Sequence, residues 1–130
     1  MLAYRMPGST SGTHSVVERQ LRQGLIPMPS RPLTIVAEFR IPAENRARFL
    51  ELCAYDSERS VADEDGCQRF EAVSPLDDAQ TIILVEVYDN EAAFETHLTT
   101  PHFKVFDAGV KELGAQLISL RKTVRVAPAA

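Results

Sequence analysis

The sequence predicts an α+β fold in which a four-stranded antiparallel sheet carries helices on one face. Three observations lead to this prediction. Hydrophobic residues alternate with polar ones in short runs of strand length, and they recur at helical spacing in the segments between those runs. The segments follow the order strand, helix, strand, strand, helix, strand, so two crossovers through helices flank one hairpin. A chain of 130 residues with 45% hydrophobic residues also suffices for the core of one domain.

The first strand is expected at residues 33–41, where hydrophobic and polar side chains alternate. Its core face is formed by Leu33, Ile35, Ala37, Phe39 and Ile41. A helix is expected from Pro42 to about Val61, because proline is tolerated in the first turn of a helix, where its missing N–H leaves no hydrogen bond unmade. Tyr55 lies beside the apolar stripe of this helix, so it is either a residue at the rim of a substrate cavity or an ordinary half-buried tyrosine.

A hairpin of two strands is expected over residues 67–88, around a turn that contains proline and aspartate. Both faces of its second strand are largely apolar, which a sheet covered on only one side does not need. We therefore expect a second copy of the chain to cover the face formed by Ile82, Leu84 and Tyr88, giving a homodimer. Glu86 on that face is then an interface ion-pair partner or a group near the cavity, because a buried carboxylate needs a partner.

A helix interrupted by Pro101 is expected next, because proline lacks the N–H that the helix would use. Asp89 or Asn90 can cap its first part, and a threonine before the proline can cap its second part. Gly114 ends the second part, and the last strand is expected at residues 116–126. This element order specifies the split β-α-β arrangement of a ferredoxin-like fold.

The N-terminal stretch differs from the rest of the chain. Residues 1–32 are expected to be a disordered or extension segment, because they contain several prolines and a run of Gly, Ser and Thr, and they show no sustained hydrophobic period. The domain is expected at residues 33–126, and residues 127–130 are expected to be a tail. Removal of the extension should therefore leave the stability of the domain nearly unchanged.

Composition excludes several classes of partner. The net charge of −4 and the lack of a basic stripe argue against nucleic acid, and the acidic run at 63–65 is interpreted as solvated surface. No apolar run approaches the ~20 residues needed to cross a bilayer, so no membrane association is expected. Cys53 and Cys67 form neither a metal-ligand set nor a disulfide framework, so we expect buried thiols in a cytoplasmic protein.

The candidate catalytic residues are the two histidines of the interrupted helix, His97 and His102. His97 follows Phe94 by three residues, which places it on the inward side of the helix. An imidazole there can remove a proton near neutral pH, since its unperturbed pKa is ~6.5, and the alternative is a buried histidine satisfied by a backbone carbonyl. His102 follows the proline break and belongs either to the site or to the surface. Phe94, Phe103 and Phe106 are the expected walls of a substrate pocket.

No metal or cofactor is expected. The two histidines are five residues apart across the proline break, and no third metal ligand is evident. The chain also lacks a phosphate-cradling array of glycines and the features of a flavin, haem or nicotinamide site. The electrons for any oxidation must then come from the substrate.

A series of short motifs lies in one order along the domain: Gly66-Cys67, Phe70, Glu86-Val87-Tyr88, Ala93-Phe94, His97 and Thr100-Pro101-His102-Phe103. This series resembles the antibiotic-biosynthesis monooxygenase (ABM) family over roughly residues 33–126. The resemblance implies a ferredoxin-like subunit that pairs through its open sheet face into a dimeric α-β barrel. Asp65 stands where many members carry proline, which should loosen the loop before Gly66.

The resemblance also implies a choice among reactions. Some members are cofactor-independent monooxygenases, which bind a quinol, a phenol or a polyketide-like aromatic, remove a proton and let the anion react with O₂, and this is the function we expect. The alternative is isomerisation of a phosphorylated dione of the autoinducer-2 processing type, because Thr99-Thr100-Pro101-His102 resembles a stretch of that isomerase. Haem degradation is disfavoured, because members with that activity use a tryptophan and this chain has none. A binding module without enzyme activity is a further alternative.

Overall fold

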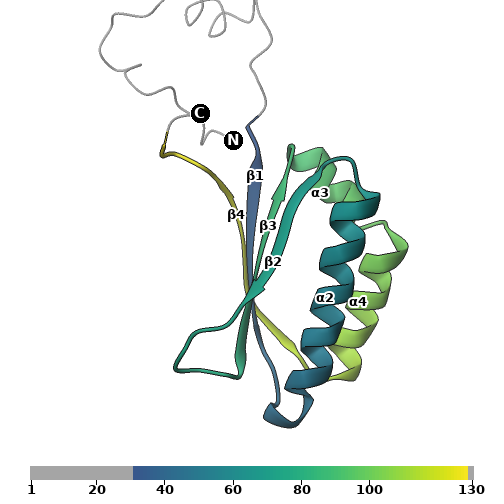
Figure 1. The fold of residues 1–130 in the computed structure, drawn as a ribbon, viewed down its shortest axis with the longest axis vertical. Coiled ribbons are helices and arrows are strands. Elements are labelled where there is room, and N and C mark those ends of the chain that lie inside the picture. Colours follow the sequence, from purple (N-terminus) through teal and green to yellow (C-terminus); the bar gives the residue numbers. More distant parts are fainter. Residues whose placement is uncertain (1–30, 129–130) are drawn as a thin grey trace, which may run out of the picture. The chain divides into compact units, whose positions relative to one another are not determined.

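One antiparallel sheet with the strand order β2-β3-β1-β4 organises the computed structural model, which describes residues 31–128 (Figure 1). The strands are β1 (Leu33–Arg40), β2 (Cys67–Val73), β3 (Thr81–Tyr88) and β4 (Gln116–Val124). β2 and β3 form the predicted hairpin, and β1 pairs with both β3 and β4. The predicted α+β fold with a four-stranded antiparallel sheet is therefore confirmed. The expected extension, apart from its last two residues, lies outside the described residues.

The helices of the described residues cover one face of this sheet (Figure 1). They are α2 (Arg46–Asp63), α3 (Glu91–His97) and α4 (Pro101–Glu112), with a short 3-10 helix, η2 (Ala43–Asn45), before α2. The predicted helix after Pro42 therefore begins with a 3-10 turn. α2 and α4 lie side by side against the sheet (Figure 1). No helix in residues 31–128 is long and apolar enough to span a membrane.

Two caps and one proline place both histidines. The Asn90 side chain caps α3 by accepting a hydrogen bond from a backbone N–H at 2.9 Å, and Thr100 caps α4 in the same way at 3.2 Å. Pro101 occupies the first turn of α4, where a missing N–H costs nothing. α3 therefore ends at His97, and α4 begins with His102 in its first turn.

The face of β3 that packs against the helices is the one formed by Ile82, Leu84 and Tyr88, each at most 2% exposed. The expectation that a second subunit covers this face is therefore wrong. Both faces of β3 are apolar, so the sequence pattern of this strand alone does not show which face packs against the helices. Its register with β1 does show this. Ala37 pairs with Leu84 and Phe39 with Ile82, and directly paired residues of antiparallel strands share a face. The clear core face of β1 thus assigns the core face of β3.

The opposite face of the sheet is left uncovered by the helices (Figure 1). Its centre is apolar, because Val36 of β1 pairs directly with Val85 of β3, between Ile83 and Val87. These four side chains are only half-buried. A surface for a second copy of the chain is therefore available on this face and not on the one expected from the sequence.

Both cysteines are buried and free, as expected. Burial raises the pKa of the Cys53 thiol and of the Cys67 thiol to about 12. Neither thiol is therefore ionised at neutral pH, and neither has the thiolate character that a reactive cysteine needs.

Candidate active site

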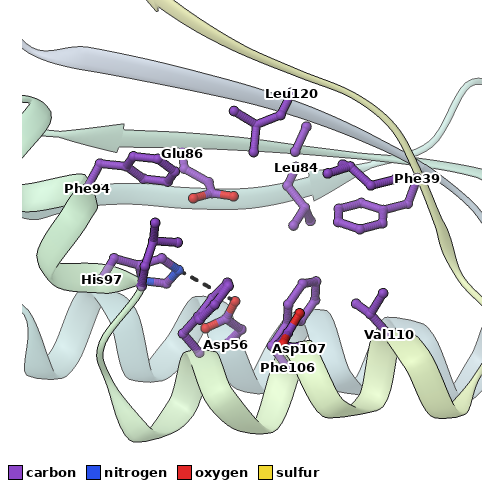
Figure 2. A pocket seen from close by; sticks show the side chains of 14 residues that line it. Phe39, Asp56, Leu84, Glu86, Phe94, His97, Phe106, Asp107, Val110 and Leu120 are labelled. Carbon is purple, nitrogen blue, oxygen red and sulfur yellow. Dashed lines mark ion pairs between the residues drawn. The ribbon is translucent and has the colours of Figure 1, made fainter.

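A cavity of about 150 Å³ lies between the sheet and the helices (Figure 2). Its walls are mainly aromatic and aliphatic side chains from both layers: Phe39, Leu84, Phe94, Phe103, Phe106 and Leu120. The predicted wall residues Phe94, Phe103 and Phe106 are therefore brought together around one cavity. Leu120 of β4 is 44% exposed, so this strand forms the side on which the cavity opens.

Three buried polar side chains reach this cavity from three elements. Asp56 comes from α2, Glu86 from β3 and His97 from α3, and each is at most 5% exposed (Figure 2). Asp107 of α4 also lines the cavity but is only half-buried, and it forms an ion pair with Lys111 at 3.6 Å. Within residues 31–128, no lysine or arginine lines the cavity. The polar groups of the cavity are thus acids and one imidazole.

His97 lies between two carboxyl groups of α2 and its C-terminal end. Its Nδ1 is 2.8 Å from Oε2 of Glu64, and its Nε2 is 4.0 Å from Oδ2 of Asp56 (Figure 2). A hydrogen on Nδ1 is donated to the Glu64 carboxylate, which leaves the lone pair of Nε2 on the side of Asp56 and the cavity. Glu64 therefore fixes both the orientation of the ring and the tautomer, as the third member of a catalytic triad does.

His102 does not line the cavity, although it is buried. Its Nε2 lies 2.5 Å from the same Oε2 of Glu64 that accepts the hydrogen bond from His97. Oε1 of Glu64 is buried and has no hydrogen-bond partner within residues 31–128. His102 thus contacts the site through Glu64, one step away from the cavity.

Burial separates the proton affinities of the three groups at the cavity. Burial lowers the pKa of His97, and the hydrogen bond to Glu64 only partly opposes this effect, so the imidazole is neutral at pH 7. Burial raises the pKa of Asp56 to about 7 and that of Glu86 to about 8. The Tyr88 hydroxyl donates to Oε1 of Glu86 at 2.6 Å and lowers that pKa less than burial raises it. The site therefore holds a neutral base together with one acid, Glu86, that keeps its proton at neutral pH and a second acid, Asp56, whose pKa lies near neutrality.

Asp56, His97 and His102 also offer possible metal-ligand atoms, which lie within 4.8 Å of one another. The sequence-based view that no third ligand accompanies the histidines is therefore wrong, because α2 supplies one. Both imidazoles already share Glu64. The cluster in this arrangement is a hydrogen-bonded network in which protons can move.

Tyr55, a candidate for the rim of the cavity, lies elsewhere. It is 43% exposed and borders a separate surface depression with Leu52 and Leu113. Sequence reasoning also missed Asp56 and placed Glu64 in a solvated acidic run, whereas the Glu64 side chain is only 6% exposed. A signal for both existed. Asp56, Ser60 and Glu64 are spaced by four residues, which places them along one side of α2, the side that faces His97.

The family model for antibiotic biosynthesis monooxygenases matches residues 32–109, which is more than half of the chain. A search of curated proteins finds no match. Solved structures share the fold at low sequence identity. A conserved protein of Bacteroides thetaiotaomicron, described as a possible oxidoreductase, has a TM-score of 0.68 and 20% identity over 74% of this chain and 99% of its own.

Two further structures are candidate antibiotic biosynthesis monooxygenases. The one from Nitrosomonas europaea has a TM-score of 0.67 and 17% identity, covering 81% of this chain and 100% of its own. The one from Deinococcus radiodurans has a TM-score of 0.64 and 23% identity, covering 75% of this chain and 94% of its own. At these identities the likeness concerns the fold.

Proposed function

The chain belongs to the antibiotic biosynthesis monooxygenase family, and from this premise we propose that it inserts one atom of O₂ into a quinol-type aromatic ring without a bound cofactor. The observation that carries the proposal is the neutral His97 imidazole, which lines a cavity whose walls are mainly aromatic and aliphatic. Such an imidazole can take the proton of a bound hydroxyl group, and the remaining anion is electron-rich enough to react with O₂.

The volume of the cavity indicates the size of the ring. An apolar cavity of about 150 Å³ is of the size that holds one benzene ring. A single-ring quinol or phenol therefore fits better than a polyketide-like aromatic with several fused rings. Phe103 and Phe106 supply flat apolar surface for such a ring, and Leu120 lies at the open side.

The reaction balances without an external reductant. His97 takes the hydroxyl proton of the quinol at Nε2, and Asp56 beside it stabilises the imidazolium that forms. The anion adds O₂ at a ring carbon, the proton returns from His97 to the peroxide, and loss of water leaves a hydroxyquinone. The ring gives up four electrons, which reduce O₂ to one product oxygen and one water. A positioned base contributes typically 10²- to 10⁴-fold to the rate.

The charge of the cavity argues against the isomerase alternative. A phosphorylated dione carries a strongly negative group, which needs cationic or N–H donors, whereas the lining residues within 31–128 include no lysine or arginine. The stretch that resembles the isomerase is also engaged elsewhere. The Thr100 hydroxyl caps α4 and His102 contacts Glu64, so neither residue lines the cavity.

We also infer that two copies pair through the uncovered sheet face. Val36, Ile83, Val85 and Val87 would otherwise leave an apolar centre open to water. A two-fold dimer would bury this face against itself, because an isologous interface uses the same surface of both subunits. Such packing would leave the cavity on the other side of the sheet in each subunit.

Oxygen consumption tests the proposed function. The full chain is supplied with a panel of single-ring quinols, three-ring anthrones and a phosphorylated dione, in air and under argon. We expect O₂ uptake with a single-ring quinol in the absence of added cofactor, and one oxygen atom from labelled O₂ in the product. Turnover of the phosphorylated dione at equal rates in air and under argon would contradict the proposal and support the isomerase.

A further inference from the structure

Glu86 is a carboxyl group in the middle of an apolar sheet face. It pairs with Ile35 of β1 and with Phe70 of β2, and Leu84 and Tyr88 share its face of β3. Its side chain points from the sheet into the space between the sheet and the helices (Figure 2). A carboxyl group in such surroundings is costly to bury unless it is neutral or paired with a cation, and the lining formed by residues 31–128 includes no lysine or arginine.

The Tyr88 hydroxyl decides which oxygen of Glu86 carries the proton. It donates to Oε1 at 2.6 Å, so Oε1 acts as the acceptor and the acid proton belongs on Oε2. Burial raises the pKa of Glu86 to about 8, which keeps this proton in place at neutral pH. Glu86 therefore presents an O–H donor to a molecule in the cavity, from the wall opposite to the helices that carry His97 and Asp56 (Figure 2).

We propose that Glu86 is the general acid of the reaction and gives its Oε2 proton to the oxygen atom that leaves as water. This inference rests on the proposed oxygenation. In the step concerned, His97 removes the proton of the ring carbon that holds the peroxide. The electron pair of that C–H bond forms the second bond of the new carbonyl group, and the O–O bond breaks. The departing hydroxide takes the proton of Glu86 and leaves as water. The proton held by His97 then restores Glu86, so no further reactant is consumed.

Asp56 is less suited to this step. Its Oδ2 lies 4.0 Å from Nε2 of His97, and the Ser60 hydroxyl donates to its Oδ1 at 3.4 Å. A positive charge on the base favours the ionised form of an acid beside it, and the Asp56 carboxylate, already populated near neutral pH, stabilises the imidazolium. Within residues 31–128 no imidazole pairs with Glu86, and its hydrogen-bond partner Tyr88 is a neutral hydroxyl. The base and the acid therefore come from different walls of the cavity.

Loss of the acid has a specific chemical consequence. Without a proton donor the O–O bond is not cleaved, and the peroxide leaves the ring carbon as H₂O₂. The quinol then loses two electrons and becomes the plain quinone, while O₂ takes both electrons and two protons. The ratio of hydroxyquinone to H₂O₂ thus reports on the donor, independently of how fast the quinol is deprotonated.

The test compares the wild-type protein with Glu86→Gln, using the quinol that the wild type oxygenates. Glutamine keeps the shape and can accept the Tyr88 hydrogen bond, but it cannot transfer a proton. We expect kcat for hydroxyquinone to fall by about 10²-fold or more, with KM changed by less than about threefold, and H₂O₂ to become the main product. Glu58→Gln, an exposed change on α2, is the matched control and should resemble the wild type.

Several outcomes would overturn the inference. If the Glu86→Gln protein keeps the wild-type product ratio, Glu86 of the wild type serves only as a hydrogen-bonding residue and is not the general acid. If Glu86→Gln fails to fold, Glu86→Leu replaces it, because an apolar residue suits this sheet face, and the same shift to H₂O₂ is expected. Infrared spectra of the wild type at neutral pH should also show a carbonyl band of a protonated acid that Glu86→Gln lacks. A band that is unchanged in Glu86→Gln would contradict this inference but not the proposed function. A wild type that consumes no O₂ refutes the proposed function and this inference together.

Discussion

Replacing Glu86 by glutamine should make the stability of the protein less dependent on pH. In the unfolded chain the pKa of this side chain is near its ordinary value of 4.5, whereas burial raises it to about 8 in the folded protein. Between these values the folded protein binds a proton that the unfolded chain has released. The free energy of unfolding therefore falls as the pH rises through this interval, by about 1.4 kcal/mol per pH unit, and the fall ends near the folded-state pKa.

The size of the effect follows from the width of the interval. About 3.5 pH units separate the two pKa values, which gives an upper limit of about 5 kcal/mol for the stability lost between acid and weakly alkaline pH. Water entering the cavity would reduce this value. Glutamine does not titrate, so the variant should match the wild type below about pH 5 and be more stable by several kcal/mol at about pH 9.

Urea unfolding followed by circular dichroism, at pH values from about 5 to about 9, measures this difference. Other ionisable groups around the cavity remain in both proteins and largely cancel in the comparison. They are Tyr88 on β3, Cys53 and Asp56 on α2, Glu64 directly after α2, His97 on α3, Asp107 on α4 and Cys67 on β2. Glu58→Gln serves as the control for loss of an exposed carboxylate. Stability curves for Glu86→Gln and the wild type that stay parallel within about 0.5 kcal/mol would refute a protonated Glu86.

His97→Ala should lower turnover by about 10²- to 10⁴-fold with the fold retained, whereas His102→Gln should cost less, and steady-state O₂ uptake measures both. Equal losses would refute the assignment of the base. Val85→Lys should convert a dimer into monomers by placing charge at the centre of the uncovered sheet face, as analytical ultracentrifugation can show. A wild-type monomer at micromolar concentration would contradict the dimer. Elemental analysis of purified protein should find no stoichiometric metal, and one equivalent of zinc or iron lost on His97→Ala would overturn the proton-transfer role.

The parts of the fold that local physical chemistry decides were predictable from the sequence. Alternation in β1 identified its core face, and Pro101 indicated the break between α3 and α4. The caps were predicted to within one residue, as Asp89 or Asn90 and as Thr99 or Thr100, and the structure selects Asn90 and Thr100. The core face of β3 was not predictable from that strand alone, because hydrophobic residues occupy both sides. Only its pairing with β1 distinguishes the two sides, and register is a property of the assembled sheet.

The site was only partly predictable, for a similar reason. Helical spacing placed His97 on the inward side of α3, and the stripe of phenylalanines indicated an apolar wall. Residue type does not distinguish Asp56 and Glu64 from ordinary acids of a helix and a loop. Their role becomes visible only when the fold brings them beside His97 of α3. Tyr55 directly precedes Asp56, and one residue turns the helix by about 100°, so the neighbour of a cavity residue faces a surface depression instead.

The loop that carries Glu64 keeps its place although Asp65 stands where many family members carry proline. The backbone N–H of Glu64 donates to the Ser60 carbonyl at 3.0 Å, and that of Cys67 donates back to the Glu64 carbonyl at 3.1 Å. Gly66 then contacts α3 so closely that a Cβ on it would lie 2.6 Å from the Cβ of Ala93. These contacts hold the loop against the helix of His97 without a proline. The position of the Glu64 carboxylate, which orients His97, therefore depends on Gly66, a residue without a side chain two positions further along.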